Sequence, residues 1–408
     1  MMQLVEQHIV KDSSFMDVCI KAKNIYNQSL YYWRQSIFGN IKYFSEFELT
    51  TLFAEFNEEN YRALPAQTSQ QVIKLLFKNI KSWQKSRKEY KKYPVKFLGR
   101  PKLPKYKKET SICIFTNQQI KIIDGYIHFP KLANLKPLRT KQNNVQQVRI
   151  IPHINHCVVE IVYNVKEAEK KDYNGKWIGV DLGLNNLATI ASNEQSFIVN
   201  GKPLKSINHY YNKRKKSLQS KLVQDVYSSK RIEKITHVRN NKVKDYLHKA
   251  SKIIIDNAVK QDITKIIIGK NENWKQNINI GKKNNRQFSS IPHATLIEMI
   301  QYKAQLVGIE TVLTQESYTS KCSALDLEPI CKHEKYVGKR KNRGLFVTAT
   351  GKLINADANG ALNIARLGLS ATGNEFKISD SVLSCVSHPK KLSVLLAKHG
   401  YLNKFNLI

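Results

Sequence analysis

The stretch KWIGVDLGLNNLATIAS, residues 176–192, decides the fold of the C-terminal half of the chain. Residues 176–180 predict a short buried strand, because a β-branched and aromatic run stands between a polar start and an acidic stop. Asn185 and Asn186 favour a tight turn into a second apolar run. Asp181 is thereby placed at a strand end on a hairpin, where a rigidly held carboxylate faces outward and can bind a divalent metal ion.

A second carboxylate lies far downstream, in the stretch INADANGALNIAR, residues 354–366. Asp357 precedes a short amphipathic helix there. The ordinary interpretation is a helix N-cap, since an Asp at that position accepts hydrogen bonds from the free N–H groups of the first turn. Taken together, Asp181 and Asp357 resemble the first and last acidic residues of an RNase H-like (RuvC-type) nuclease.

The wider sequence resembles the TnpB family of insertion-sequence-encoded proteins, which are compact relatives of the type V CRISPR effectors. The resemblance rests on Asp-Leu-Gly after a strand, on Asn-Ala-Asp-Ala-Asn-Gly-Ala-Leu-Asn-Ile downstream, and on five further segments, and it extends to about residue 366. The further segments are YRALPAQTSQQV (61–72), GRPKLPKYK (99–107), DYLHKASKIIIDNA (245–258), GKNENWKQN (269–277) and ESYTSK (316–321).

The charge composition indicates a nucleic acid partner. The 408 residues include 67 Lys plus Arg against 32 Asp plus Glu, a formal net charge of +35. An excess spread over the whole chain opposes compaction by self-repulsion unless a polyanion neutralises it. A ribosome-associated or chromatin-like protein would share this composition, but not the two acidic motifs.

The cysteine spacing and the apolar runs of the sequence predict the cellular compartment. The six cysteines show no disulfide-framework spacing, which favours a reducing compartment. The N-terminus lacks the basic segment and apolar run of a signal peptide, and no apolar run approaches transmembrane length. We therefore expect a cytoplasmic protein, acting in a prokaryotic cytosol or nucleoid.

The resemblance implies an α+β multidomain fold with two lobes. One lobe would be a β-barrel (wedge-like) domain with an inserted helical recognition domain. The other would be an RNase H-like (RuvC) α/β nuclease domain with an inserted target-nucleic-acid-binding segment that is a degenerate zinc ribbon. The expected boundaries are 1–12 and 100–170 for the barrel, 13–99 for the recognition domain, 171–315 and 354–370 for the nuclease domain, 316–353 for the inserted segment, and 371–408 for a C-terminal tail with partial disorder.

The middle catalytic glutamate of the family is missing from its usual position. In the family it directly follows the strand predicted here for residues 263–268, where this chain has Gly269. The two candidates to replace it are Glu272, in a polar loop, and Glu316, just after another β-branched run. We favour Glu316, because it stands at a strand end like Asp181 and because a subset of the family has a glutamate in this rearranged place.

The resemblance implies that Asp181, Glu316 and Asp357 are catalytic residues that hold two Mg²⁺ ions. Such ions, about 3.5–4 Å apart, would flank the scissile phosphate, one activating water and the other stabilising the leaving 3′-oxygen. Asp181 would bridge the two ions, and the other two carboxylates would hold one each.

Zinc is not expected as a cofactor. Family members often carry a four-cysteine zinc ribbon between the middle acid and the last Asp. This chain has only Cys322, Cys331 and His333 there, without a paired-cysteine spacing.

Several basic and aromatic stretches predict nucleic acid contacts. A helix predicted at 15–38 carries aromatic residues among amides and Arg, and a helix predicted at 66–88 carries Gln and Lys on one face. The basic, proline-punctuated linker at 85–108 suits tracking along an RNA backbone. Solvated polar faces are the ordinary alternative for each. The residues expected to contact nucleic acid are Tyr31, Arg34, Gln70, Gln71, Lys74, Lys105, Lys107, Lys213, Arg214, Lys215, Lys339, Arg340 and Arg343.

The resulting hypothesis is an RNA-guided, Mg²⁺-dependent DNA endonuclease encoded by a transposable element. A guide RNA from the transposon end would read a double-stranded DNA target by base pairing, and the protein would read a short flanking motif. We expect a monomer with no membrane partner. The alternatives are a nuclease-inactive, RNA-guided DNA-binding regulator, which the loss of the acid at Gly269 mildly favours, and an RNA-binding protein without a DNA target.

Overall fold

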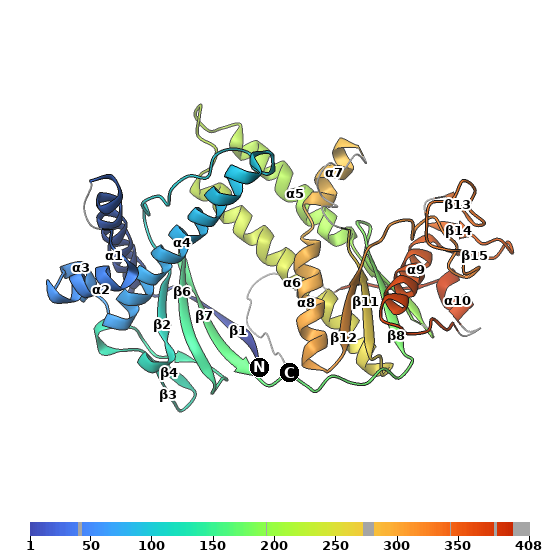
Figure 1. Ribbon diagram of the computed structural model, residues 1–408, viewed down its shortest axis with the longest axis horizontal. Helices are drawn as coiled ribbons and strands as arrows, with labels where there is room; N and C mark the ends of the chain where they lie inside the picture. Colours follow the sequence, from blue (N-terminus) through green and yellow to red (C-terminus); the bar gives the residue numbers. More distant parts are fainter. Residues whose placement is uncertain (40–42, 193, 272–280, 343, 379–381, 395–408) are drawn as a thin grey trace. The chain divides into compact units, whose positions relative to one another are not determined.

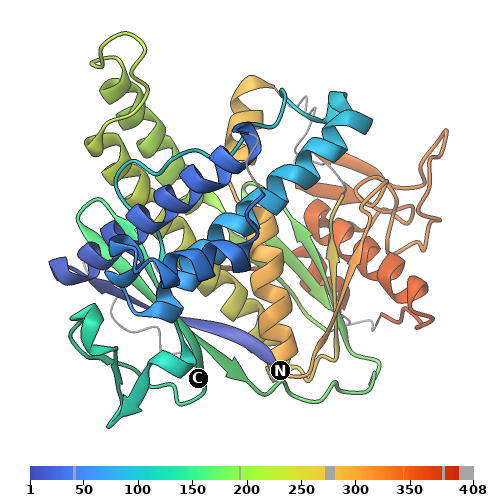
Figure 2. The same ribbon diagram turned by 60° about the vertical axis from the view of Figure 1, so that its left-hand side comes forward.

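The structure is a computed structural model that describes residues 1–39, 43–192, 194–271, 281–342, 344–378 and 382–394. The fold mixes helices with several sheets. The chain divides into two compact units, Met1–Lys166 and Glu167–Ile408, and each is described by itself (Figures 1 and 2). Glu272 and Arg343 lie outside the described residues.

The first unit is built on an antiparallel sheet with strand order β1-β7-β6-β2, covered by two long helices, α1 and α4 (Figure 1). Trp33 of α1, Leu76 of α4 and Phe115 of β2 are completely buried in one common core. A smaller sheet has the order β3-β4-β5. The bounds are β1 Met2–Val10, α1 Ser13–Phe38, α2 Glu46–Glu55, α3 Glu59–Arg62, α4 Ala66–Lys92, β2 Cys113–Thr116, β3 Lys121–Ile123, β4 Tyr126–His128, β5 Leu138–Arg139, β6 Val145–His153 and β7 His156–Val165. Since β1 and β2 are the edges of the larger sheet, its closure into a barrel stays a prediction.

The second unit is built on a six-stranded mixed sheet with strand order β12-β11-β8-β9-β10-β16. Strands β8, β11 and β12 are parallel, β8 to β10 form an antiparallel meander, and β16 pairs parallel to β10. The bounds are β8 Trp177–Leu182, β9 Asn186–Ser192, β10 Ser196–Asn200, α5 Lys202–Gln219, α6 Lys230–Lys260, β11 Lys265–Gly269, α7 Lys282–Ser289, α8 His293–Leu306, β12 Glu310–Thr314, β13 Lys339–Asn342, β14 Leu345–Val347, β15 Leu353–Asn355, α9 Ala356–Ala371, α10 Val382–Ser387 and β16 Lys390–Leu392.

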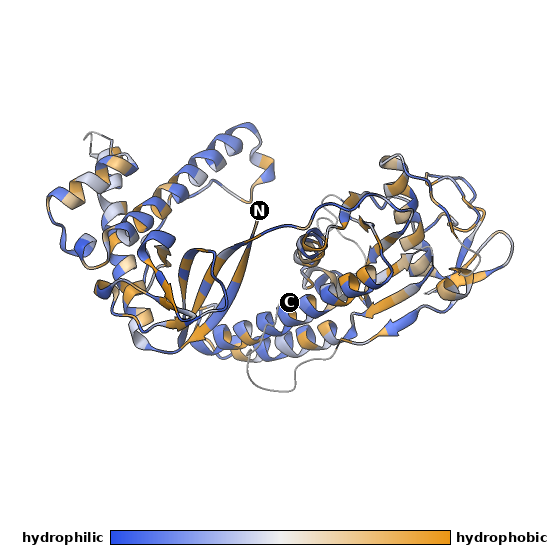
Figure 3. Ribbon diagram, turned by 90° about the horizontal axis from the view of Figure 1, so that it is seen from below, coloured by the Kyte–Doolittle hydropathy of each residue, from blue (hydrophilic) through white to orange (hydrophobic). Residues whose placement is uncertain are grey.

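Alternate residues of the central strands face different helical layers. In β8, Ile178 and Val180 belong to the core shared with α6 and α8, whereas Trp177 belongs to the core shared with α9. In β11, Ile266 faces the first core and Ile267 the second. The sheet is therefore the middle of three layers, and hydrophobic residues run along its strands (Figure 3).

Helix α9 lies very close to β8. A Cβ atom added to Gly179 would lie 2.0 Å from the backbone oxygen of Ala361, so only glycine fits at this position of the strand. The helix itself is buried on almost every side, including Ala358, Ala361 and Leu362. This packing fixes the start of α9 against the end of β8.

Part of the C-terminal tail is ordered. Residues 382–387 form α10, and residues 390–392 add β16 to the edge of the six-stranded sheet. Val382 and Val386 are completely buried. Residues 382–394 of the tail are therefore ordered, with β16 paired to β10 and these valines in the core, and the expectation of partial disorder for 371–408 as a whole stays a prediction.

No helix in the described ranges is both long and apolar enough to span a membrane.

Gly179→Ala should destabilise the second unit, because the added methyl group would meet a carbonyl that cannot move unless α9 shifts. We expect the free energy of unfolding in urea to fall by about 1–3 kcal/mol. The control is Gly99→Ala, where the methyl group would meet nothing within 4 Å. A Gly179→Ala variant as stable as the control would contradict this close packing.

Candidate active site

Three parallel strands of the second unit end at one edge of the sheet. Asp181 lies near the end of β8, Gly269 ends β11, and Glu316 follows the end of β12. The pairings of β8 with β11 and of β11 with β12 are both parallel, so these ends lie side by side. In open α/β sheets this edge is where ligands bind.

The side chain of Glu316 fills the space above Gly269. A Cβ atom added to residue 269 would lie 2.4 Å from Glu316 Oε1 and 2.6 Å from its Cγ, closer than real Cβ contacts allow. Gly269 pairs with Thr314 in the register of β11 and β12, so the chain turns back across the end of β11 after β12. The glycine that removes the family's usual acid is therefore the residue that makes room for Glu316.

Asn271 holds Glu316 from the neighbouring loop. The backbone N–H of Glu316 donates to Asn271 Oδ1 at 2.8 Å, and Asn271 Nδ2 donates to Glu316 Oε2 at 3.4 Å. The other carboxylate oxygen, Oε1, is buried without a hydrogen-bond partner among the described residues. Burial raises the pKa of Glu316 to about 7. An orphaned carboxylate oxygen of this kind fits a cation ligand.

Asp357 lies in the first turn of α9, and the N-cap interpretation of it is wrong. The N-cap is Asn355, whose side chain accepts from the N–H groups of Asp357 and Ala358. The Asp357 carboxylate is thereby free for other contacts. Asn186 Nδ2 donates to its Oδ2 at 2.7 Å, and Arg340 Nη2 lies 3.4 Å from its Oδ1.

Asp181 lies close enough to Glu316 and Asp357 for their negative charges to shift its pKa. Its Oδ2 lies against the start of α9, 2.9 Å from where a Cβ atom of Gly360 would be. Burial raises the pKa of Asp181 well above its usual value, and repulsion from Glu316 and Asp357 raises it further, while Arg340 opposes the shift. The structure therefore brings the three sequence-predicted acids into one group of like charges.

The chemistry of these three acids fits divalent metal ions. Their side chains do not yet form a compact set of ligands. Three carboxylates offer hard oxygen ligands, and one buried oxygen lacks any other partner. In the described part of the second unit, however, no three His, Cys, Asp or Glu ligand atoms all lie within 4.8 Å of one another. Binding an ion would require these side chains to close in.

Two buried amides of α9 hold the loop that follows Glu316, and the sequence analysis missed them. Asn359 Nδ2 donates to the Cys322 carbonyl at 2.9 Å, and its Oδ1 accepts from the Ala324 N–H at 2.9 Å. Asn363 Nδ2 donates to the carbonyls of Thr319, at 2.9 Å, and Cys322, at 2.7 Å. Two asparagines one helical turn apart among the small and apolar residues of a helix are the signal that could have revealed this role.

In the first unit the predicted nucleic acid contacts divide into exposed and internal residues. Tyr31 is 52% exposed, and Gln70 and Lys74 are exposed on α4, with Gln71 partly buried beside them. Arg34 is instead an internal residue, because its Nη2 donates to the Pro104 carbonyl and its guanidinium lies over the Tyr106 ring. Lys105 is exposed, and Lys107 lies over the Tyr26 ring.

In the second unit the predicted contacts lie on two elements. Lys213 and Arg214 are exposed on α5, and Lys215 lies 6.0 Å from the Tyr211 ring centroid. Lys339 is exposed on β13, next to Arg340 with its contact to Asp357.

The cysteines and histidine of the inserted segment make backbone contacts. Cys322 is buried, and its Sγ faces the Cys331 carbonyl at 3.7 Å. His333 Nε2 lies 2.7 Å from the Pro329 carbonyl and 3.4 Å from Cys331 Sγ.

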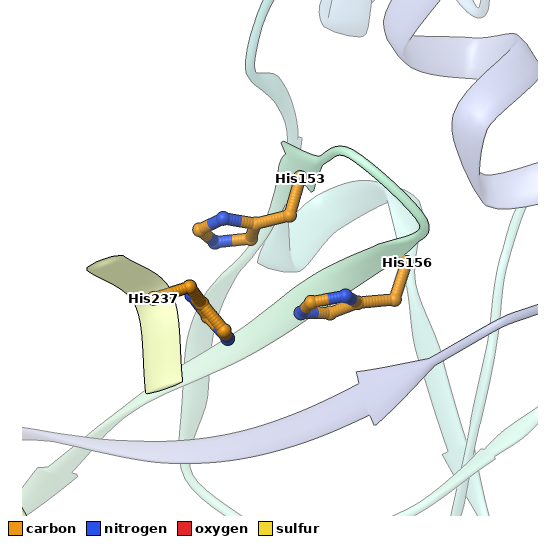
Figure 4. Close-up of side chains that lie close together, drawn as sticks. All are labelled: His153, His156 and His237. Carbon is orange, nitrogen blue, oxygen red and sulfur yellow. The ribbon is translucent and has the colours of Figure 1, made fainter. Parts of the chain in front are cut away.

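A histidine pair that the sequence analysis did not single out lies on the β6–β7 hairpin. The rings of His153 and His156 stack with centroids 5.0 Å apart and planes 12° apart (Figure 4). Figure 4 also draws His237, which belongs to the second unit.

Comparison with known families places this site in context. Residues 160–275 match the family OrfB_IS605, described as "Probable transposase", and residues 293–364 match the family described as "Cas12f1-like, TNB domain". The TnpB-like protein MJ0751 of Methanocaldococcus jannaschii is 33% identical over 130 residues. In these segments the chain is similar to TnpB-like proteins. The aligned residues are 31% of this chain and 45% of that relative, so the match spans less than half of the relative's length.

Solved structures also match the chain, at low identity. The structure described as "Cryo-EM structure of the Cas12f1-sgRNA-target DNA complex" is 17% identical, with a TM-score of 0.38 over 88% of this chain and 98% of that chain. "Structure of the mini-RNA-guided endonuclease CRISPR-Cas_phi3" is 11% identical, with a TM-score of 0.47 over 93% and 94%. At these TM-scores neither likeness says more about this chain.

Glu316→Gln should stabilise the metal-free protein above neutral pH. The pKa of Glu316 is raised from 4.5 to about 7, so the folded protein binds more protons than the unfolded chain between these values. Its stability therefore falls as the pH rises through this window, and the full cost, at most about 3 kcal/mol, is present above pH about 7. Glutamine removes that cost.

Thermal unfolding in EDTA across this pH range measures the effect. The variant should equal the original protein at acidic pH and exceed it at alkaline pH. The exposed-acid control Glu334→Gln should follow the original protein throughout. A Glu316→Gln variant that is less stable than the original protein at alkaline pH would contradict the conclusion that ionising the buried Glu316 carboxylate destabilises the metal-free protein.

Proposed function

We propose that this chain is an RNA-guided DNA endonuclease of a transposable element, with Asp181, Glu316 and Asp357 as its catalytic acids in an RNase H-like (RuvC) domain. The observation that carries the proposal is the Glu316 carboxylate above Gly269, at the same sheet edge as Asp181, whose own carboxylate lies against the start of α9. Glu316, which follows β12, thus occupies the space that an acidic side chain at position 269 would fill. We assign this chain to the family's subset with the rearranged glutamate on that basis.

The chain's own residues would prepare this edge for metal ions and for a phosphodiester. Two Mg²⁺ ions held by the three acids would supply Lewis-acid activation of water and charge stabilisation at the phosphate. Asn186 and Asn271 orient two of the carboxylates by hydrogen bonds. Arg340 partly neutralises the group and would offer a cation to a bound phosphate.

The net charge of +35 supports a polyanionic partner, which we propose is a guide RNA from the transposon end together with a double-stranded DNA target. The first unit would comprise the wedge and recognition domains, and the second would comprise the nuclease domain with its inserted segment. We propose a monomer that acts in the prokaryotic cytosol or nucleoid, and Mg²⁺ rather than zinc as its cofactor.

Guided cleavage tests this proposal. The protein would be purified together with the transcript of its own locus and incubated with Mg²⁺ and a plasmid carrying a guide-matched target beside randomised flanking sequence. We expect RNA-dependent cleavage with a consistent flanking motif. Asp181→Ala should abolish cleavage while RNA and target binding persist, because it removes a metal ligand and leaves the nucleic acid surfaces unchanged.

Other outcomes would contradict the proposal. Guided binding without any cleavage by the original protein would indicate the nuclease-inactive regulator. RNA binding without target binding would indicate an RNA-binding protein of another kind.

Moving the acid back to β11 tests the role of Glu316. Glu316→Ala should abolish cleavage, and adding Gly269→Glu to it should restore part of the activity, because the two side chains use the same space. Gly269→Glu alone should lower activity, since both carboxylates would then compete. Full cleavage by Glu316→Ala, with loss on Glu272→Gln instead, would contradict the assignment, and Glu334→Ala is the matched control.

A further inference from the structure

The linker after α4 is held against α1 and α4 as an extended strap, residues 101–108. The same hydrogen-bonding pattern recurs along it, with a side chain of a helix donating to a backbone carbonyl. Three carbonyls accept in this way: Pro101 from Trp83 Nε1 at 3.2 Å, Pro104 from Arg34 Nη2 at 2.6 Å, and Lys107 from Asn27 Nδ2 at 2.9 Å.

The pinned carbonyls recur every three residues, which is the period of a polyproline II helix, and two of them belong to prolines. Residues at positions 101, 104 and 107 are partly buried, as expected for the face held against the helices. The next residue in each step is exposed, and in each case it is a lysine: Lys102, Lys105 and Lys108.

Exposed lysines therefore occur at every third residue of the strap, and a polyproline II rise would space these residues about 9 Å apart. In the described part of the chain none of the three makes an ion pair. Like charges spaced along the strap repel one another, so these lysines have a favourable role only opposite a polyanion.

A groove of about 460 Å³ lies between the strap and the helices. Its lining includes Asn79, Ser82, Trp83 and Ser86 of α4 and the strap residues Lys102 and Lys105. The second half of α4, which forms this wall, is predominantly hydrophilic (Figure 3). A polar groove of this size has the capacity of a small-ligand pocket, enough for a nucleotide of a single strand.

We propose that the strap and this groove bind a single-stranded segment of RNA. The three lysines would neutralise successive phosphates. The partly exposed Trp83 ring and the Tyr106 ring, which Arg34 covers on one face, would offer aromatic surfaces to unpaired bases. Ser82, Ser86 and the Asn79 amide, one N–H of which donates to the Tyr26 hydroxyl, would offer hydrogen bonds to the 2′-hydroxyl that distinguishes RNA. This inference rests on the proposed function only in taking RNA as the partner of the chain.

The salt dependence of RNA binding by the full chain tests this proposal. The variant carries Lys102→Ser, Lys105→Ser and Lys108→Ser. A control with the same loss of charge carries Lys121→Ser, Lys131→Ser and Arg139→Ser, three exposed positions on or beside the small sheet of the same unit. The probe is a fluorescently labelled single-stranded RNA from the transcript of the locus, followed by anisotropy across a salt series.

Losing three phosphate contacts should reduce the slope of log K against log salt by about two units, at about 0.7 per phosphate of a single strand. The control variant should keep the slope of the original protein. Equal slopes in the two variants would overturn the proposal, even if the original protein cuts guided targets. Failure of the original protein to bind RNA at all would overturn the proposed function as well.

Photocrosslinking of the full chain distinguishes RNA from DNA. Single-stranded RNA substituted with 4-thiouridine should crosslink to peptides containing Trp83 or Tyr106, as located by mass spectrometry. Crosslinking elsewhere only would overturn the site. An equal yield with 4-thiothymidine DNA of the same sequence would overturn the assignment to RNA.

Discussion

The close packing of α9 against the central sheet is the constraint on which the candidate active site depends. Gly179 has no side chain, which lets the helix approach β8 until its backbone is almost in contact with the strand. The helix carries Asp357 in its first turn and, further along, the buried Asn359 and Asn363, which hold the loop after Glu316. One helix thus fixes two of the three acids relative to the sheet that carries Asp181. The buried amides are satisfied only when that loop is in place, so the site and the core support each other.

The position of the middle acid follows from the geometry of parallel strands. The ends of β11 and β12 lie in register, Gly269 beside Thr314, so a carboxylate from either strand can reach the same space. An acid at the end of β11 and an acid after β12 exclude each other, because that space holds only one side chain. Burial raises the pKa of both Asp181 and Glu316, and repulsion from Glu316 and Asp357 raises that of Asp181 further, so ionising these acids carries a cost. Metal ions at the site would remove that cost, and Arg340 offsets part of it without them.

Local patterns in the sequence predicted the elements that carry the site, and long-range contacts explain what they missed. The strand predicted at 176–180 is confirmed as β8, and the strand at 263–268 as β11, because buried β-branched runs are a strong local signal. The capping role of Asn355 was missed because an Asp two residues later seemed an equally good cap. The internal role of Arg34 depends on a linker 70 residues away in the chain, which composition cannot reveal.

The most direct test of the central claim is a structure of the protein bound to guide RNA and target DNA in the presence of Ca²⁺, which supports metal binding without requiring the reaction to proceed. The account predicts metal density in contact with carboxylate oxygens of Asp181, Glu316 and Asp357, with the Glu316 side chain still lying over Gly269. Metal density bound by Asp181 and Asp357 together with an acid of the loop after β11, and with Glu316 turned away, would contradict it.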